Sequence, residues 1–250
     1  MVTDMPATGT PAFIAGLAAT RPMPAIWHPS PNYGERRGGA KPDIVVLHYT
    51  AMRSAEDARA VLCDPVAEVS AHYLIDEAGG VLQLVEEGQR AWHAGAGSWG
   101  SVCDVNSRSI GIELSNCGGS PFAAGQMDAL EDLLCGILTR WDIPPHRVIG
   151  HSDMAPGRKI DPGVRFDWRR LARVGLSVWP EGPDAPDMAR LDQEQFQSDL
   201  VAFGYSPEVA FETLLDAFRL RFRPAARGAA FELADQQVAA ALSKLGTALG

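Results

Sequence analysis

Apolar and polar positions fall into short blocks along the chain, and these blocks predict strands that alternate with helices. Residues 44–47 are a continuous apolar run, typical of a strand buried on both faces, and His48 follows at its carboxyl end. Residues 71–75 and 81–85 are separated by a glycine-containing turn and predict a hairpin. A further strand is predicted at 109–114, where apolar residues alternate with polar or small ones.

Helical spacing is clearest in residues 126–141, and a proline pair at 144–145 ends the pattern. The apolar residues that recur there are Met127, Leu130, Leu134, Ile137 and Trp141. A second helix is predicted to begin at Ser54, which has a carboxylate three residues later, and a short strand at 148–149 follows the long helix. Elements in this order favour an α/β fold with a mixed central β-sheet flanked by helices.

Composition divides the chain into four predicted segments. Residues 1–24 are rich in proline, glycine and alanine and are expected to form an N-terminal arm. Residues 25–180 carry the strand and helix patterns and are expected to form the main domain. Residues 181–190 are acidic and proline-containing, which is typical of a linker. Residues 191–250 contain three apolar clusters at helical spacing and predict a small helical module.

Charge and composition exclude several classes of partner. The 250-residue chain has a formal net charge of −9 and no long basic run, so nucleic acid is not an expected partner. An apolar stretch long enough to span a membrane is not apparent. The four cysteines form no C-x-x-C pair, which argues against a cysteine zinc site, and we expect them to be reduced.

Two histidines stand at positions where α/β sheets assemble their sites. His48 and His151 each follow directly on an apolar strand, at its carboxyl end. Asp161 lies ten residues beyond His151, in a glycine- and proline-containing turn that would fold the carboxylate back toward it. Two histidines and one carboxylate form a set that holds catalytic zinc and leaves one position open. Spacing alone leaves open that either histidine is structural.

Five motifs, in order, resemble one family across residues 25–180. They are I-V-V-L-H-Y-T (44–50), V-S-A-H-Y-L-I (69–75), A-W-H-A-G (91–95), N-S-R-S-I-G-I-E-L-S-N (106–116), and G-H-S-D (150–153) followed by G-R-K-I-D-P-G (157–163). In these motifs the chain resembles the type 2 N-acetylmuramoyl-L-alanine amidases, which are related to phage lysozyme-type amidases and animal peptidoglycan recognition proteins. The resemblance implies the amidase fold and hydrolysis of the bond between N-acetylmuramic acid and L-alanine.

The resemblance also implies roles for particular residues. Zinc would be bound by His48, His151 and Asp161, and Glu113 and Lys159 would be catalytic. A glutamate near zinc can take a proton from water and pass it to the leaving amine, and a lysine can stabilise charge on the carbonyl oxygen. An exposed strand glutamate and a solvated loop lysine are the alternatives for Glu113 and Lys159.

Other family matches concern the substrate. His72 and His93 match positions along the cleft, with a structural histidine as the alternative for each, and Asn32 and Arg36 are candidate substrate contacts. Residues 97–105 lack the basic residues that many relatives carry, so the preferred fragment is left open. The C-terminal helices resemble a peptidoglycan-binding module, and a helical appendage that packs on the amidase domain is the alternative.

These observations favour a zinc-dependent amidase acting on muropeptides, with a non-catalytic peptidoglycan-binding protein as the second hypothesis. The resemblance leaves open whether the substrate is a soluble anhydromuropeptide from cell-wall recycling or polymeric peptidoglycan. The start of the chain has an acidic residue where an export signal needs a basic one, and the cysteines suit a reducing compartment. We therefore expect a cytoplasmic enzyme, with the periplasm as the alternative, and the sequence does not indicate the oligomeric state.

Overall fold

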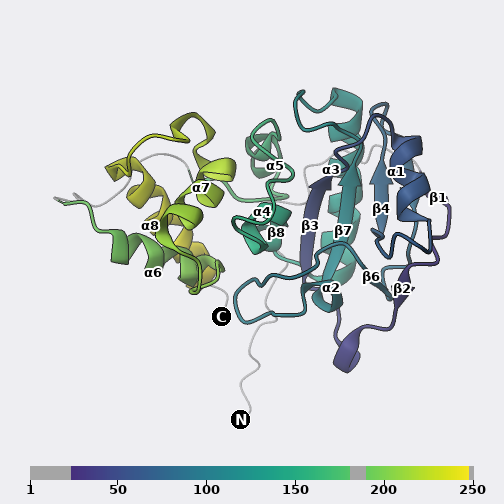
Figure 1. The fold of residues 1–250 in the computed structure, drawn as a ribbon, viewed down its shortest axis with the longest axis horizontal. Helices are drawn as coiled ribbons and strands as arrows, with labels where there is room; N and C mark the ends of the chain where they lie inside the picture. The colour runs from purple at the N-terminus through teal and green to yellow at the C-terminus, as the bar shows by residue number, and fades with distance from the viewer. Residues whose placement is uncertain (1–23, 181–189, 248–250) are drawn as a thin grey trace, which may run out of the picture.

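A six-stranded mixed sheet forms the centre of the computed structural model, which describes residues 24–180 and 190–247 (Figure 1). The strands in spatial order are β1 (Ile26–Trp27), β5 (Val81–Gln83), β4 (Tyr73–Ile75), β7 (Ser109–Leu114), β3 (Ile44–Tyr49) and β8 (Val148–Gly150). The β4–β5 pair is antiparallel and forms the predicted hairpin, whereas the other neighbouring pairs are parallel. The predicted α/β fold with a mixed central sheet is confirmed.

One face of the sheet is covered by the long helix α3 (Ala124–Trp141) and by α5 (Trp168–Arg173). The helical pattern predicted for residues 126–141 is confirmed, because the regularly spaced apolar side chains of α3 are buried against Val45, Leu47, Ile110 and Ile112. The helix ends at Asp142, whose left-handed backbone conformation lets its N–H cap the last turn.

The opposite face has two coverings. Helix α1 (Ala55–Leu62) packs over β4, and the Ser54 side chain caps it by accepting from the Asp57 N–H at 3.1 Å, at the start that the sequence predicts. Over β3 and β8 lie the loop around Trp99 and the C-terminal helices, which contact Ile44, Val46 and Ile149. The helices beyond residue 190 therefore bury the sheet's apolar surface.

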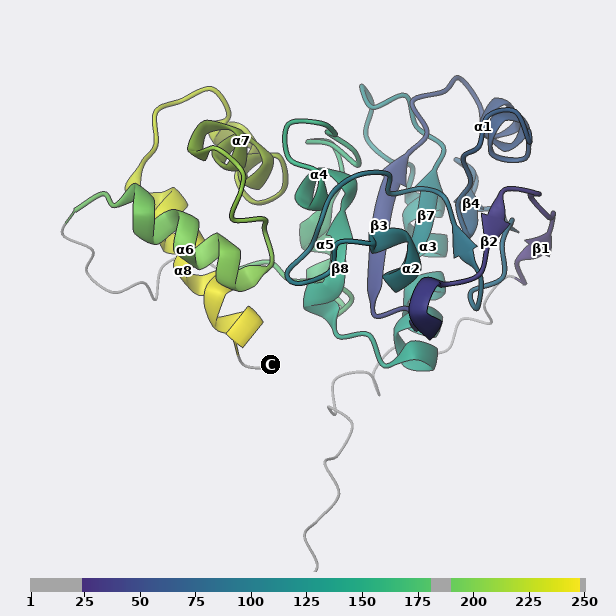
Figure 2. The same ribbon diagram turned by 60° about the horizontal axis from the view of Figure 1, so that its bottom comes forward.

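The C-terminal helices are α6 (Gln193–Phe203), α7 (Phe211–Phe222) and α8 (Leu233–Thr247), as the three apolar clusters predict. Figure 2 shows them side by side at one end of the molecule, with α7 toward α4 (His151–Met154). Their aromatic and aliphatic side chains form one buried cluster with residues of the sheet and of the Trp99 loop, which we call the shared core. Its members include Ile44, Val46, Trp99, Val102, Ile149, Phe196, Leu200, Phe203, Tyr205, Leu214, Phe218 and Phe222.

Short elements complete the fold. Strands β2 (Tyr33–Gly34) and β6 (Arg90–Ala91) form a separate antiparallel pair, and α2 (Val105–Arg108) precedes β7. Short 3-10 turns are η2 (Arg37–Gly39), η3 (Pro145–Arg147) and η4 (Pro224–Ala226). All four cysteines are unpaired, and within residues 24–180 and 190–247 each helix is too short or too polar to cross a membrane. The expected arm at 1–24 and linker at 181–190 fall almost wholly outside the described residues.

Candidate metal centre and active site

Strand register brings the first two candidate residues together. His48 on β3 is the direct neighbour of Glu113 on β7, one residue before each strand ends. In the paired strands, both side chains point to the face opposite the α3 core, because their neighbours Leu47, Ile112 and Leu114 fill that core. The parallel pairing thus delivers an imidazole and a carboxyl group to one end of the sheet.

His151 and Asp161 reach the same place from the end of β8. His151 begins α4 directly after Gly150, and a side chain at Gly150 would meet Pro162 Cδ at 2.8 Å. The Asp161 loop folds back onto α4, and its carbonyl oxygen accepts from the Ser152 N–H at 2.9 Å. The turn that the glycines and proline predict therefore brings the carboxylate to His151.

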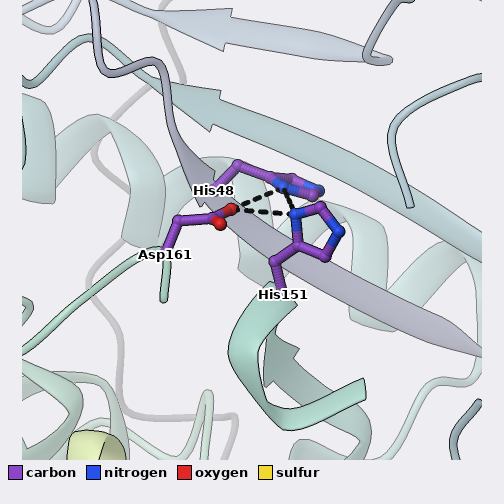
Figure 3. A group of neighbouring side chains, drawn as sticks. All are labelled: His48, His151 and Asp161. Carbon is purple, nitrogen blue, oxygen red and sulfur yellow. Dashed lines mark hydrogen bonds and ion pairs between the residues drawn. The ribbon is translucent and has the colours of Figure 1, made fainter. Parts of the chain in front are cut away.

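Three potential ligand atoms converge at this point (Figure 3). Nδ1 of His48 lies 2.9 Å from Oδ2 of Asp161 and 3.0 Å from Nδ1 of His151, and His151 Nδ1 lies 3.0 Å from the same Oδ2. A tetrahedral ion with bonds of about 2.1 Å sets its ligand atoms roughly 3.4 Å apart, so modest adjustment accommodates one. All three residues are buried.

A chain of hydrogen bonds fixes the tautomer of His48. Ser109 Oγ donates its only proton to the Val105 carbonyl at 2.6 Å, so it accepts from His93 Nε2 at 3.2 Å. The neutral His93 ring then presents a lone pair at Nδ1, and His48 Nε2 donates to it at 3.0 Å. Burial lowers the pKa of His48 to about 4 and that of His93 well below its usual value, so both rings are neutral at neutral pH. His48 consequently carries a lone pair at Nδ1.

The tautomer of His151 is also fixed by a hydrogen bond at Nε2. Its Nε2 donates to the Ala94 carbonyl oxygen at 2.8 Å, which leaves a lone pair on Nδ1. Two nitrogen lone pairs and a carboxylate oxygen thus face one point at contact distance, which is favourable when a cation lies between them. The three residues form a candidate metal site.

Glu113 provides a carboxyl group that internal bonds do not satisfy. Its Oε2 is buried and has no hydrogen-bond partner among the described residues. Burial, followed by the charge of Asp161, raises the pKa of Glu113 to about 8, and the positive charge of Lys159 acts in the opposite direction. A carboxyl group with a pKa near neutrality is suited to both accepting and donating a proton. The positive charge of Lys159 also lowers the pKa of His48.

A cavity of about 520 Å³ opens over these groups. Its lining includes His48, Glu113, His151, Asp161 and Lys159. Apolar side chains supply much of the remaining wall: Tyr49, Met52, Val61, Val69, Trp92 and Ile160. Cavities of about 770 and 670 Å³ lie elsewhere and are larger, but their linings contain none of the converging ligands. Chemistry rather than size therefore marks this cavity as the candidate active site.

The four predicted substrate contacts are placed differently from one another. His93 lines the cavity, but its ring also bonds His48, and it lies over Gly111, where a Cβ would meet ring atoms at 2.4–2.6 Å. His72 is fully buried behind it: Nδ1 accepts from the Gly111 N–H at 3.0 Å, and Nε2 donates to the Gln89 carbonyl at 3.1 Å. His72 is absent from the cavity lining, and both of its ring nitrogens bond backbone groups.

Asn32 and Arg36 are also buried and are outside the cavity lining. The Asn32 amide nitrogen donates to two carbonyl oxygens, of Asp64 and Val69, each at 2.8 Å. The Arg36 guanidinium donates to four carbonyl oxygens, those of Glu87, Asn106, Ser107 and Ser109. The side-chain donors of both residues are therefore satisfied by backbone carbonyl groups.

Sequence reasoning missed Arg158 in the cavity wall. Its guanidinium donates to the carbonyl oxygens of Ala94, at 2.7 Å, and of Ala96, and it lies 3.3 Å from His151 Nε2. Arg158 thereby fixes the segment that accepts the hydrogen bond of His151. Its position beside Lys159 was the available signal, because it lies in the same motif and only three residues from Asp161.

Comparisons with known proteins agree on one family. The family model described as N-acetylmuramoyl-L-alanine amidase matches residues 38–164. The chain is 32% identical over 231 residues to N-acetylmuramoyl-L-alanine amidase AmiD of Escherichia coli K12, which covers 80% of this chain and 81% of AmiD. The match therefore includes the C-terminal helices as well as the sheet.

Two similar solved structures contain ligands. AmiD from E. coli in complex with the substrate anhydro-N-acetylmuramic acid-L-Ala-D-γ-Glu-L-Lys has a TM-score of 0.72 and 31% identity, covering 86% of this chain and 98% of that one. AmpDh3 from Pseudomonas aeruginosa in complex with anhydromuramic pentapeptide has a TM-score of 0.71 and 30% identity, covering 87% and 95%. Both resemble this chain across the sheet and the helices.

Proposed function

Because the chain belongs to the N-acetylmuramoyl-L-alanine amidase family and is an amidase, we propose that zinc is its metal and soluble anhydromuropeptides are its substrate. The bond cut is the amide between the lactyl group of N-acetylmuramic acid and L-alanine. The observation that carries this proposal is the convergence of His48 Nδ1, His151 Nδ1 and Asp161 Oδ2 within 3.0 Å, beside Glu113.

Zinc fits the donor set best. Magnesium and calcium prefer shells made of oxygen, whereas two imidazole nitrogens and one carboxylate are a common catalytic zinc set with a fourth position open. His48, His151 and Asp161 would hold the ion. The chemistry that zinc supplies there is activation of water and polarisation of the amide carbonyl. His93 and Ala94 orient the two imidazoles through their outer nitrogens.

Glu113 is proposed as the proton carrier. Its carboxylate takes a proton from the attacking water, whose oxygen forms a bond to the lactyl carbonyl carbon. When the bond from that carbon to the alanine nitrogen breaks, Glu113 passes the proton to the leaving amine. The raised pKa of Glu113 suits both transfers. Lys159, on the wall of the same cavity, stabilises the negative charge that develops on the carbonyl oxygen.

The proposed substrate is supported by relatives. AmiD and AmpDh3 have solved structures with anhydromuramic peptides, and both match nearly the whole chain. The apolar cavity wall suits a single sugar-peptide fragment with few charges near the cut bond. The four unpaired cysteines suit a reducing compartment, so the proposal includes action on recycled fragments in the cytoplasm. Fractionation of cells that express the native gene tests this last point, and recovery with periplasmic markers would contradict it.

An isotope experiment tests the bond and the substrate together. We would incubate anhydro-N-acetylmuramyl-tripeptide with the protein in ¹⁸O-labelled water and analyse the products by mass spectrometry. The proposal predicts one ¹⁸O in the lactyl carboxylate of the sugar and an unlabelled tripeptide with a free amino terminus. Label in a peptide fragment instead means that a different amide is cut. Faster release from intact sacculi than from the soluble fragment contradicts the substrate proposal.

A further inference from the structure

Asp153 lies two residues after His151 and turns its carboxylate away from the metal ligands. It is fully buried in α4 and binds three donors. Oδ2 accepts from the Gly150 N–H at 2.8 Å and from Arg221 Nη1 at 2.6 Å, and Oδ1 accepts from the Tyr205 hydroxyl at 2.6 Å. Two of the three donors come from the C-terminal helical segment, more than 50 residues further along the chain.

Arg221 on α7 connects several elements around His151. Besides Asp153, its Nη2 donates to the Val148 carbonyl oxygen of β8 at 3.1 Å and to Ser177 Oγ at 3.2 Å. Its guanidinium carbon lies 4.0 Å from the centre of the Trp168 ring on α5. The side chain is 2% exposed, so its charge is compensated inside the protein, mainly by Asp153. One side chain of α7 thus bonds both β8 and α4, and His151 lies at the junction of these two elements.

Tyr205 holds Asp153 from the end of α6. Burial raises the pKa of Tyr205 well above its usual value, so the hydroxyl keeps its proton and donates. The ring packs edge-on against Trp99, with 5.1 Å between centroids. The loop that carries Trp99 begins at Ala94, which accepts the outer hydrogen bond of His151, and its Ser98 N–H donates to the Met154 carbonyl at 2.9 Å. The helices therefore support both α4 and the loop that orients the imidazole.

We propose that the C-terminal helices are a positioning element of the metal site, in which Tyr205 and Arg221 grip Asp153 and so fix the His151 ligand. The proposal rests on the proposed zinc centre. It assigns the segment 191–250 a role inside the amidase reaction, in addition to any contact it makes with peptidoglycan. Tyr205, Arg221 and Asp153 are positioning residues, because they act on the metal through the backbone of α4.

Measurement of the zinc affinity of the full chain tests this positioning role of the C-terminal helices. Tyr205→Phe removes one hydroxyl, and Tyr73→Phe is the matched control, because the buried Tyr73 hydroxyl donates to the Glu87 carboxylate at 2.8 Å, away from the ligands. We expect Tyr205→Phe to weaken zinc binding by up to about tenfold, the lower end of the loss caused by removing a group bonded directly to a ligand, because Tyr205 acts one bond further away through Asp153. The visible bands of the cobalt-substituted protein should also shift. Arg221→Lys retains the positive charge but loses the several N–H donors of the guanidinium. It should weaken zinc binding by an equal or larger factor.

Three outcomes would overturn the proposal. Tyr205→Phe and Arg221→Lys with wild-type zinc affinity and cobalt spectrum would mean that the helices only pack on the sheet. Weaker zinc binding in Tyr73→Phe of the same size would mean that any lost buried hydrogen bond loosens the site. A wild-type protein that binds no zinc would overturn the proposed function as well, whereas a zinc-binding, active wild type with unaffected variants would overturn this inference alone.

Discussion

At the scale of single residues, the site depends on which nitrogen of each imidazole carries the proton. Ser109 accepts a hydrogen bond from Nε2 of His93, and the Ala94 carbonyl accepts one from Nε2 of His151. His93 Nδ1 in turn accepts from Nε2 of His48, so the proton of each ring is on Nε2. His48 and His151 then each present a lone pair at Nδ1. Because these partners are backbone groups or buried side chains, the tautomers are determined before any metal arrives.

Changing Glu113 to glutamine separates proton transfer from metal binding. The amide has nearly the same shape but no basic oxygen, and Glu113 is not among the three converging ligands. We expect Glu113→Gln to retain zinc at wild-type stoichiometry and to lose kcat by about 10²–10⁴-fold. Metal analysis and steady-state kinetics on the same preparation check this. Retention of most of the activity would rule out Glu113 as the general base.

Substituting His93 tests the hydrogen-bond chain. His93→Ala removes the acceptor of His48 Nε2 and should weaken zinc binding by roughly 10–100-fold. His93→Asn should restore part of this, because its amide oxygen can take the place of Nδ1. Competition with a chromogenic chelator measures both affinities. If His93→Ala raises KM and leaves zinc affinity unchanged, His93 acts on the substrate instead.

The meeting of the candidate ligands His48 and His151 was predictable from the sequence, because strand ends converge at one edge of a parallel sheet and both residues follow an apolar run. The buried positions of Asn32, Arg36 and His72 were not predictable. Their residue types and motifs resemble cleft residues, but burial depends on which backbone carbonyls fold over them, and local sequence does not contain that information.

At the scale of elements, β7 combines two functions in alternate residues. Ile110, Ile112 and Leu114 fill the core beneath α3, while Ser109, Gly111 and Glu113 face the site. Gly111 is required because the His93 ring lies directly over it. The strand was predicted at its observed bounds because its alternation has the period of a pleated sheet, whereas α2 and α4, of four residues each, are too short to produce a periodic signal.

A methyl group at position 111 should displace the His93 ring. Gly111→Ala places a Cβ within 2.4–2.6 Å of three ring atoms, and relief requires the ring or the strand to move. Overpacking of this kind costs about 1–3 kcal/mol. Thermal unfolding should show the loss of stability, and chelator competition should show weaker zinc binding. Ile137→Val in α3, buried on the opposite face of the sheet and outside the cavity lining, is a control that changes stability alone. Wild-type zinc affinity in Gly111→Ala would contradict the role assigned to His93.

At the scale of the whole molecule, the helices beyond residue 190 and the sheet share one hydrophobic core. The amino-acid sequence predicts the three helices but leaves open whether they bind glycan or pack on the amidase domain. The packing could not be read from periodicity, because the shared core joins Trp99 and Val102 of an irregular loop to Phe203 and Tyr205. Contacts between segments about 100 residues apart depend on the fold.

Removal of residues 181–250 should therefore destabilise the remaining chain. Deletion exposes Ile44, Val46, Trp99 and Ile149 of the shared core, which are 0–2% exposed in the full chain. We expect low solubility and a lower Tm than that of the full chain, because this apolar surface then faces water. Circular dichroism melting and size-exclusion chromatography check this. A soluble, monomeric 1–180 fragment with the Tm of the full chain would show that the helices form an independent module.

The most direct test of the central claim is to remove and restore zinc while the products of anhydro-N-acetylmuramyl-tripeptide are measured by mass spectrometry. We expect the zinc-loaded protein to release free tripeptide, to lose that activity after chelation and dialysis, and to regain it when one equivalent of zinc is added. His151→Ala should show no recovery, because one of the three converging ligands is missing. Tripeptide release that continues in the protein shown to be zinc-free would contradict the account.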